Sequence, residues 1–178
     1  MRKALYILGV LDDSDIDWMV SIGKREHISA GTILIHEGSE IRSVYIVLDG
    51  AFAVRTAAAG SESIAVLKAG EIVGEMSFVD ARPPSADVVA LENSTVLSLP
   101  RSLLTERLKD PGFAMRFYRA LAIFLANRLR KTVSRFGYGK ISGRSGTDDE
   151  EEIGPTALEN LSVAGARFEW MLKKLRGQ

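Results

Sequence analysis

The stretch Gly70–Ala90, GEIVGEMSFVDARPPSADVVA, contains the signals from which fold and function are predicted. Gly70 and Gly74 let the backbone turn tightly and come close to a ligand. Gly74, Glu75 and Met76 begin a segment that can form one helical turn, whose free N–H groups suit an anion. The carboxylate of Glu75 is suited to accept hydrogen bonds from sugar hydroxyls. The stretch therefore predicts a cradle for a small ligand that carries hydroxyls and a phosphate.

The stretch ends with Arg82-Pro83-Pro84-Ser85-Ala86, which is followed by the β-branched pair Val88-Val89. Together with Gly74-Glu75 it resembles the phosphate-binding cassette of the cyclic nucleotide-binding domain family, which includes catabolite activator protein and kinase regulatory subunits. The resemblance implies that Glu75 binds the ribose 2′-hydroxyl of cyclic AMP or cyclic GMP, and that Ser85 and Ala86 help to hold the cyclic phosphate. The candidate ligand-binding residues are Gly74, Glu75, Met76, Arg82, Ser85 and Ala86.

One position departs from the family pattern, because Pro84 stands where the family has its phosphate-binding arginine. A charge-assisted hydrogen bond contributes about 1.5–3 kcal/mol, so its loss weakens binding roughly tenfold to more than a hundredfold. Proline also lacks a backbone donor. Arg82 can be interpreted as a substitute that swings into the pocket, or as a solvent-facing residue in a local salt bridge. We favour the second interpretation, which puts cyclic nucleotide binding in doubt.

Composition excludes several classes of site. The chain has 178 residues, 46% of them hydrophobic, which suits one domain of ordinary size plus appendages. It contains no cysteine, which excludes disulfides, cysteine metal sites and a thiol nucleophile, and is consistent with the cytoplasm. No apolar run approaches the roughly 20 residues needed to span a bilayer. His27 and His36 lack the spacing of a metal motif, so we predict no metal.

No catalytic motif is present. The sequence has no G-x-S-x-G, no Walker loop and no H-E-x-x-H pattern. Glu75 and Ser85 are of the residue types of an acid and a nucleophile, but the cassette has no histidine or lysine to activate the serine. We therefore expect neither enzymatic activity nor a cofactor.

Short β-branched runs alternate with glycine turns over residues 25–100, and Asp49-Gly50 is typical of a hairpin turn. Such spacing predicts a small barrel or jelly roll without helical crossovers. The fold class is therefore mainly β with flanking helices. By the family resemblance, which extends over residues 13–135, it is a double-stranded β-helix, or jelly-roll, domain with a long C-terminal helix. A preceding helix should run from Asp12, Asp13 or Ser14 to Ile22, with Ile16, Met19 and Val20 inward.

Two helices should follow the strands, and the resemblance identifies them as the family's B helix (residues 100–110) and C helix (112–136). The C helix has an apolar stripe of three- and four-residue steps, made of Phe113, Phe117, Leu121, Phe124, Leu125, Leu129 and Val133. In the family this helix caps the ligand and, in one branch, pairs with its twin, so we expect a homodimer through it. Packing only on its own barrel explains the first half of the stripe but explains Leu129 and Val133 less easily.

The whole sequence divides into three parts. Residues 1–136 form the predicted cyclic nucleotide-binding-like domain, 137–154 a flexible linker with five consecutive acids, and 155–178 an amphipathic helix. This last helix suits a partner groove or a membrane surface, but docking on its own domain or on its twin is favoured. One helix cannot form a helix-turn-helix, so specific DNA binding is not expected.

Charge is unevenly distributed although the net charge is zero. Residues 101–144 carry 11 Lys/Arg and 2 Asp/Glu, a net of +9, whereas residues 1–100 carry 8 and 14, a net of −6. A basic segment of this kind can contact nucleic acid or membrane, but packing against acidic parts of the same chain or its twin is favoured.

Two functions are compatible with these features. The first is a ligand-responsive regulatory module that binds a cyclic nucleotide or related phosphate ligand and relays it through the C helix to a protein partner. The second is a degenerate member of the fold that binds no cyclic nucleotide and acts as an interaction or assembly module. A membrane- or transporter-associated subunit rests on amphipathicity alone, and membrane contact is not expected.

Overall fold

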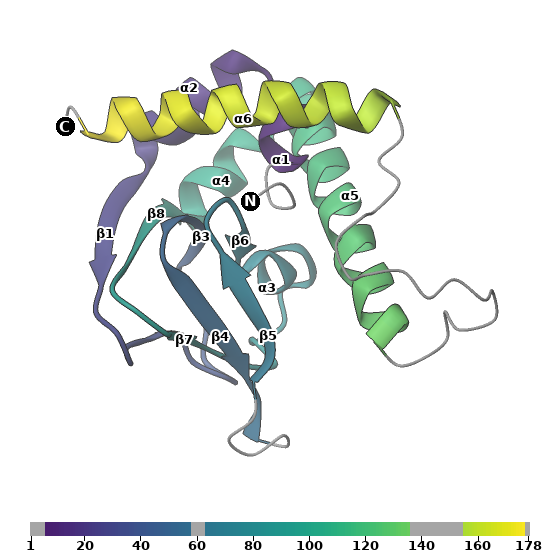
Figure 1. Cartoon of the computed structure of the whole chain (residues 1–178). Helices are drawn as coiled ribbons and strands as arrows, with labels where there is room; N and C mark the ends of the chain where they lie inside the picture. Colours follow the sequence, from purple (N-terminus) through teal and green to yellow (C-terminus); the bar gives the residue numbers. More distant parts are fainter. Residues whose placement is uncertain (1–5, 58–62, 136–154, 177–178) are drawn as a thin grey trace.

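A computed structural model describes residues 6–57, 63–135 and 155–176, and in it two antiparallel four-stranded sheets form a β-roll (Figure 1). The strand orders are β1-β8-β3-β6 in one sheet and β2-β7-β4-β5 in the other. The strands are β1 (Lys24–Ile28), β2 (Ile33–Ile35), β3 (Ser43–Asp49), β4 (Ala51–Arg55), β5 (Ser63–Lys68), β6 (Ile72–Val73), β7 (Asp87–Ala90) and β8 (Ser94–Pro100). This confirms the predicted jelly roll. The predicted linker, 137–154, lies outside the described residues.

The hairpin predicted at Asp49-Gly50 is wrong. Strand β3 pairs with β6 and β8, whereas β4 pairs with β5 and β7, so the chain passes from one sheet to the other at Gly50. Gly50 has φ of 88°, and a Cβ atom there would lie 2.8 Å from the Cα of Ser94. The Asp-Gly pair therefore marks a corner of the roll, where both the positive φ and the close approach of β8 require glycine.

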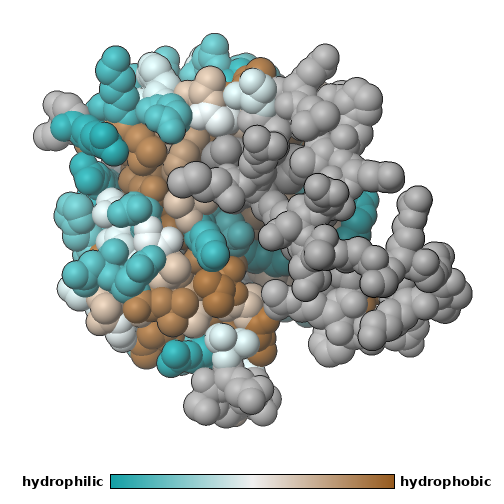
Figure 2. All heavy atoms as spheres, in the orientation of Figure 1, coloured by the Kyte–Doolittle hydropathy of each residue, from teal (hydrophilic) through white to brown (hydrophobic). Residues whose placement is uncertain are grey.

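Two hydrophobic cores result from this arrangement, one inside the roll and one between the roll and the helices. Strand β3 contributes to both because its side chains alternate: Val47 belongs to the inner core, and Val44 and Ile46 belong to the helix-side core. Both faces of this sheet are thus covered. Figure 2 shows apolar side chains also on the outer surface over the lower part of the roll, where Ile64 and Val66 of β5 are exposed.

Six helices lie in the described part of the chain: α1 (Tyr6–Val10), α2 (Asp13–Ile22), α3 (Glu75–Asp80), α4 (Arg101–Arg107), α5 (Pro111–Arg135) and α6 (Pro155–Arg176). Helix α2 begins at a capping box, in which Asp12 and Asp15 each accept a hydrogen bond from the other's backbone N–H. Asp15 is fully buried and also accepts hydrogen bonds of 2.6 and 2.9 Å from Arg116 of α5. The first turn of α2 therefore holds the beginning of α5.

Helix α5 has two apolar faces rather than the single stripe expected. Phe113, Phe117 and Phe124 are buried on the side that faces the domain. Leu129 and Val133 are 63% and 43% exposed, because their positions on the helical wheel lie with Met115 and Tyr118 on the opposite side. The own-domain packing considered above therefore accounts for the first half of the helix, and leaves the second face uncovered in the single chain.

Helix α6 lies across α1 and α2 of its own chain (Figure 1). Ala164 and Met171 are fully buried, and Leu175 is nearly so, within the helix-side core. Of the alternatives given for this helix in the sequence analysis, the structure shows it docked on its own domain.

We predict that Gly50→Ala destabilises the fold more than Gly31→Ala. Both glycines have positive φ, 88° and 81°, so alanine costs about 1–2 kcal/mol at either position. Only at Gly50 does the added Cβ also overlap β8, since nothing lies within 4 Å of the corresponding point at Gly31. Urea denaturation followed by tryptophan fluorescence measures both losses of unfolding free energy. Equal losses would contradict the interpretation of Gly50 as a close-packed corner.

Candidate functional site

The cassette begins where β6 ends. Gly74 follows β6 with φ of 86° and precedes α3, which starts at Glu75. A Cβ atom at position 74 would lie 3.2 Å from Cδ1 of Ile41 and 3.3 Å from Cδ1 of Ile35. Gly74 is therefore required by the positive φ and by the closeness of two buried side chains. Its turn directs Glu75 inward and leaves the next residue, Met76, 52% exposed.

Glu75 is a buried carboxylate with a cationic partner from α5. Its exposure is 2%, and Nη1 of Arg128 donates a hydrogen bond to its Oε1. The other terminal nitrogen of Arg128, Nη2, lies 3.9 Å from Oε2 of Glu71 and 3.5 Å from the carbonyl oxygen of Ile72. The guanidinium also lies over the ring of Phe124, 4.6 Å from its centroid. The carboxylate expected to bind a ribose is thus already in contact with the long helix.

Burial raises the pKa of the Glu75 carboxyl, and the charge of Arg128 and a backbone N–H offset only part of this rise. A buried carboxylate is costly unless it is paired and hydrogen-bonded. The contact with Arg128 therefore stabilises the charged form of Glu75 and at the same time fixes the position of α5 relative to the cassette.

Arg128 is the residue of this site that sequence reasoning missed. The predicted apolar stripe of the C helix does not include it. Its position four residues after Phe124 and seven after Leu121 places it on the buried face, and an arginine on an apolar stripe is a signal for a buried acidic partner. The sequence contains that signal, although it does not identify Glu75 as the partner.

The phosphate end of the predicted cassette has a different character. The Arg82 side chain is 84% exposed, and its Nε lies 4.0 Å from Oδ2 of Asp80. The structure thus places it in solvent beside a local acid, not where it would replace the missing arginine. Ser85 is exposed and Ala86 is half-buried. The predicted ligand residues are therefore divided between a buried end at Glu75 and an open end at Arg82 and Ser85.

The backbone around Pro84 is held by a neighbouring turn. The carbonyl oxygen of Pro84 accepts a hydrogen bond of 2.8 Å from the N–H of Gly38. In the same turn, the N–H of Glu37 donates to Oδ1 of Asp87 at 2.7 Å, and the Glu37 carboxylate accepts from the N–H of Ala57. The surroundings of the proline thus include two carboxylates, which do not favour an anion.

The histidines and acidic side chains do not form a metal site in the described part of the chain. Within residues 6–57, 63–135 and 155–176, no three histidine, aspartate or glutamate side chains are grouped so that they could hold a metal ion. Nδ1 of His27 lies 3.2 Å from Oγ1 of Thr95. None of the helices in these ranges is both long and apolar enough to cross a membrane.

Comparison with known proteins gives matches that include the β-roll and the cassette. Residues 25–110 match the family model described as "Cyclic nucleotide-binding domain". The cyclic AMP receptor protein of Thermus thermophilus is 33% identical over 126 residues, which are 68% of this chain and 56% of the relative. An uncharacterized NTE family protein of Mycobacterium tuberculosis is 30% identical over 131 residues, 72% of this chain and 22% of the relative. The chain thus spans between about a fifth and just over half of the length of these two relatives.

A solved structure supports the fold. The cyclic nucleotide-binding domain from Methylobacillus flagellatus superposes with a TM-score of 0.68 at 24% identity, covering 81% of this chain and 85% of that one. The matched residues 25–110 include the whole cassette and nearly all of the β-roll. The chain therefore belongs, through residues 25–110, to the cyclic nucleotide-binding domain family.

Proposed function

We propose that the chain is a ligand-responsive regulatory module, in which a cyclic nucleotide or related phosphate ligand binds between the cassette and α5. The observation that carries this proposal is the contact of Arg128 with the buried Glu75. A site whose acid is held by the helix that covers it can convert ligand binding into movement of that helix.

The proposed mechanism follows from competition at one carboxylate. A ligand hydroxyl that donates to Glu75 shares or displaces the hydrogen bond from Arg128. A ligand shifts the equilibrium between two positions of α5 only by the difference in its affinity for them. The carboxylate of Glu75 supplies this difference, because Arg128 and the ligand hydroxyl share it. Backbone N–H groups around Ser85 and Ala86 hold the anionic end, against the unfavourable charge of the nearby Glu37 and Asp87 carboxylates. Helix α5 then moves relative to the roll, and a protein partner responds to its position in the cytoplasm, without specific DNA binding.

A module that binds no cyclic nucleotide is the second candidate. Two observations favour it: Pro84 replaces the family's arginine, and Arg82 lies in solvent. The ring of Phe78 also packs against Phe117 of α5 at 5.9 Å, so aromatic contacts join the cassette helix to α5 without a ligand. In this alternative, Arg128 is the permanent partner of Glu75 and the protein works through its surfaces.

Calorimetric titration with cyclic AMP and cyclic GMP distinguishes the two functions. We expect binding that is weakened at least about tenfold by Glu75→Gln, because the neutral amide is a poorer acceptor for a hydroxyl. Glu106→Gln is the matched control, since Glu106 lies on the exposed surface beside Lys109. Absence of heat up to millimolar ligand would contradict the first function and favour the second.

We predict that Pro84→Arg strengthens binding of either cyclic nucleotide roughly tenfold to a hundredfold, because it restores a bidentate partner for the phosphate. Arg82→Met should change affinity little, because this side chain lies in solvent. The same titration measures both variants. A large loss with Arg82→Met would show that Arg82 enters the site when ligand binds, and would contradict the assignment of the phosphate end.

A homodimer through α5 is part of the proposal. Met115, Tyr118, Leu129 and Val133 form an exposed apolar stripe opposite the buried face of this helix. Their spacing of three, eleven and four residues keeps them on one side, as in the seam of a helix pair. A second copy of the chain can cover this stripe with its own.

We predict that the protein is a dimer and that Leu129→Glu makes it monomeric, because an unpaired carboxylate in an apolar seam is costly. Leu103→Glu serves as the control, since Leu103 is also a partly exposed leucine but lies on α4. Sedimentation equilibrium measures the mass. A monomeric wild-type protein, or equal effects of the two substitutions, would refute pairing through α5.

A further inference from the structure

The face formed by α1 and α2 receives α6 through apolar anchors at regular spacing. Ala164, Met171 and Leu175 are buried with exposures of 0%, 0% and 4%. They are seven and four residues apart, so they lie on one side of α6. They pack in the same core as Leu8 of α1 and Met19 of α2. The small residue at 164 and the large residues at 171 and 175 define the shape of the helix that this face accepts.

An arginine of α6 binds the polar part of the same face. Nη1 of Arg167 donates to the carbonyl oxygen of Leu8 at 2.8 Å and to that of Leu11. Its Nε donates to Oδ1 of Asp13 at 2.7 Å. The partial negative charge at the carbonyl end of α1 and the carboxylate of Asp13 both favour a cation at this position. The Arg167 side chain is only 19% exposed, which distinguishes it from an ordinary surface arginine.

A second charged contact completes the complementarity. Nζ of Lys174 lies 2.8 Å from Oδ1 of Asp17, which is one turn beyond Asp13 on α2. Acids on α2 thus face bases on α6 at two points separated by seven residues of α6. The face consequently discriminates by charge as well as by shape.

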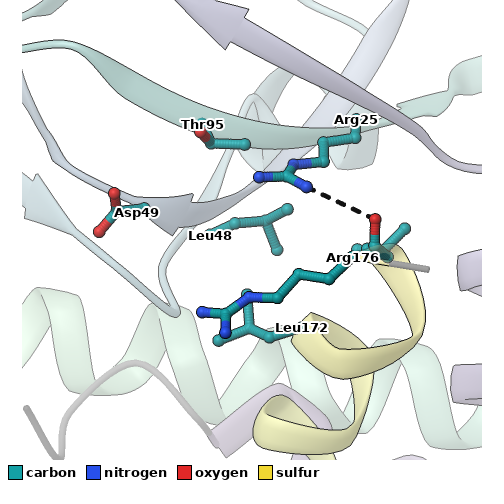
Figure 3. Close-up of a pocket in the computed structure, with 7 residues that line it drawn as sticks. Arg25, Leu48, Asp49, Thr95, Leu172 and Arg176 are labelled. Atoms are coloured by element: carbon teal, nitrogen blue, oxygen red, sulfur yellow. Dashed lines mark hydrogen bonds between the residues drawn. The ribbon is translucent and has the colours of Figure 1, made fainter. Parts of the chain in front are cut away.

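Helix α6 takes no part in either sheet. Both sheets are complete without it, and its main contacts are with α1 and α2. Near its carboxyl end a cavity of about 210 Å³ separates it from the roll, lined by Arg25, Leu48, Asp49, Thr95, Leu172, Leu175 and Arg176 (Figure 3). The one hydrogen bond drawn across this cavity, from Arg25 to the carbonyl of Leu175, is long at 3.5 Å. The end of α6 is therefore held mainly by the burial of Leu175, with one long hydrogen bond to the β-roll.

We propose that the α1–α2 face is a receptor for a basic amphipathic helix, that α6 is its resident occupant, and that a partner's helix binds by displacing α6. The partner helix carries a small residue, an arginine three positions later, and large apolar residues seven and eleven positions after the small one. This goes beyond ligand sensing at the cassette, because it assigns a protein-binding surface to α1 and α2.

The test uses a fluorescent peptide of residues 155–178 and the full chain carrying Arg167→Met, in which the resident helix is weakened. We expect the wild-type peptide to bind this chain at least about tenfold more tightly than it binds the wild-type chain, because a charge-assisted contact of α6 has been lost. A peptide with Arg167→Met should bind at least tenfold more weakly than the wild-type peptide. A peptide with Lys173→Met, which changes an exposed lysine of the same helix, should bind equally well.

A second variant of the full chain provides the test if the Arg167→Met variant does not fold. Lys174→Glu reverses the charge that faces Asp17 and removes the contact of Lys174 with the Trp170 ring, both at the surface, so peptide binding should increase by up to about fivefold, with the same order of the three peptides. Failure of the wild-type peptide to bind either folded variant, or equal binding of the Arg167→Met peptide, would overturn the proposal. The peptide could instead dissociate a dimer in which the α6 of each chain occupies the α1–α2 face of the other. The occupant of the face would then be a second copy of the chain, and this result would also overturn the proposal.

Discussion

The ion pair between Glu75 and Arg128 is the constraint on which the arrangement of this domain depends. Glu75 is placed in the interior by the left-handed turn at Gly74, and an interior carboxylate requires a partner. The nearest cation comes from α5, more than fifty residues later in the chain. As a result, the helix that covers the roll is attached at Glu75, the residue that the sequence resemblance predicts as the ribose-binding carboxylate.

A second ion pair fixes the other end of the same helix. Arg116 lies twelve residues before Arg128 and binds the fully buried Asp15 of α2. Between the two arginines, Phe117 and Phe124 fill the helix-side core. Helix α5 is therefore held by an ionic contact near each end and by apolar packing between them. A change at Glu75 acts on one end of a helix whose other end is attached to α2, and α2 in turn carries α6.

Much of the fold could be predicted from the sequence, because its signals are local. Alternating β-branched runs gave most strands, and the helical periodicity gave α2, α5 and α6 within one or two residues. The polar strand β1, KREHI, has no apolar alternation of its own and is ordered by pairing with β8. The corner at Gly50 was mistaken for a hairpin because a two-residue Asp-Gly turn has the same local sequence in both settings.

The candidate site was less predictable because its partners are distant in sequence. The cassette pattern identified Glu75, but only the three-dimensional structure pairs it with Arg128. The two faces of α5 were merged in the sequence interpretation because Leu129 follows the buried residues at plausible helical steps, and only the burial of each residue separates them. Similarly, the start of α2 was predicted at its acidic residues, whereas the contacts of these acids with arginines of two other helices depend on tertiary packing.

Amide hydrogen exchange of residues 125–133 in wild-type protein and in the Glu75→Gln variant tests the central claim most directly. If the ion pair holds α5 to the cassette, the variant should exchange about tenfold or more faster in this segment, while β3 and β8 keep their protection. Glu106→Gln should leave the segment unchanged. Equal protection of α5 in all three proteins would contradict the claim that Glu75 and Arg128 fix the position of this helix.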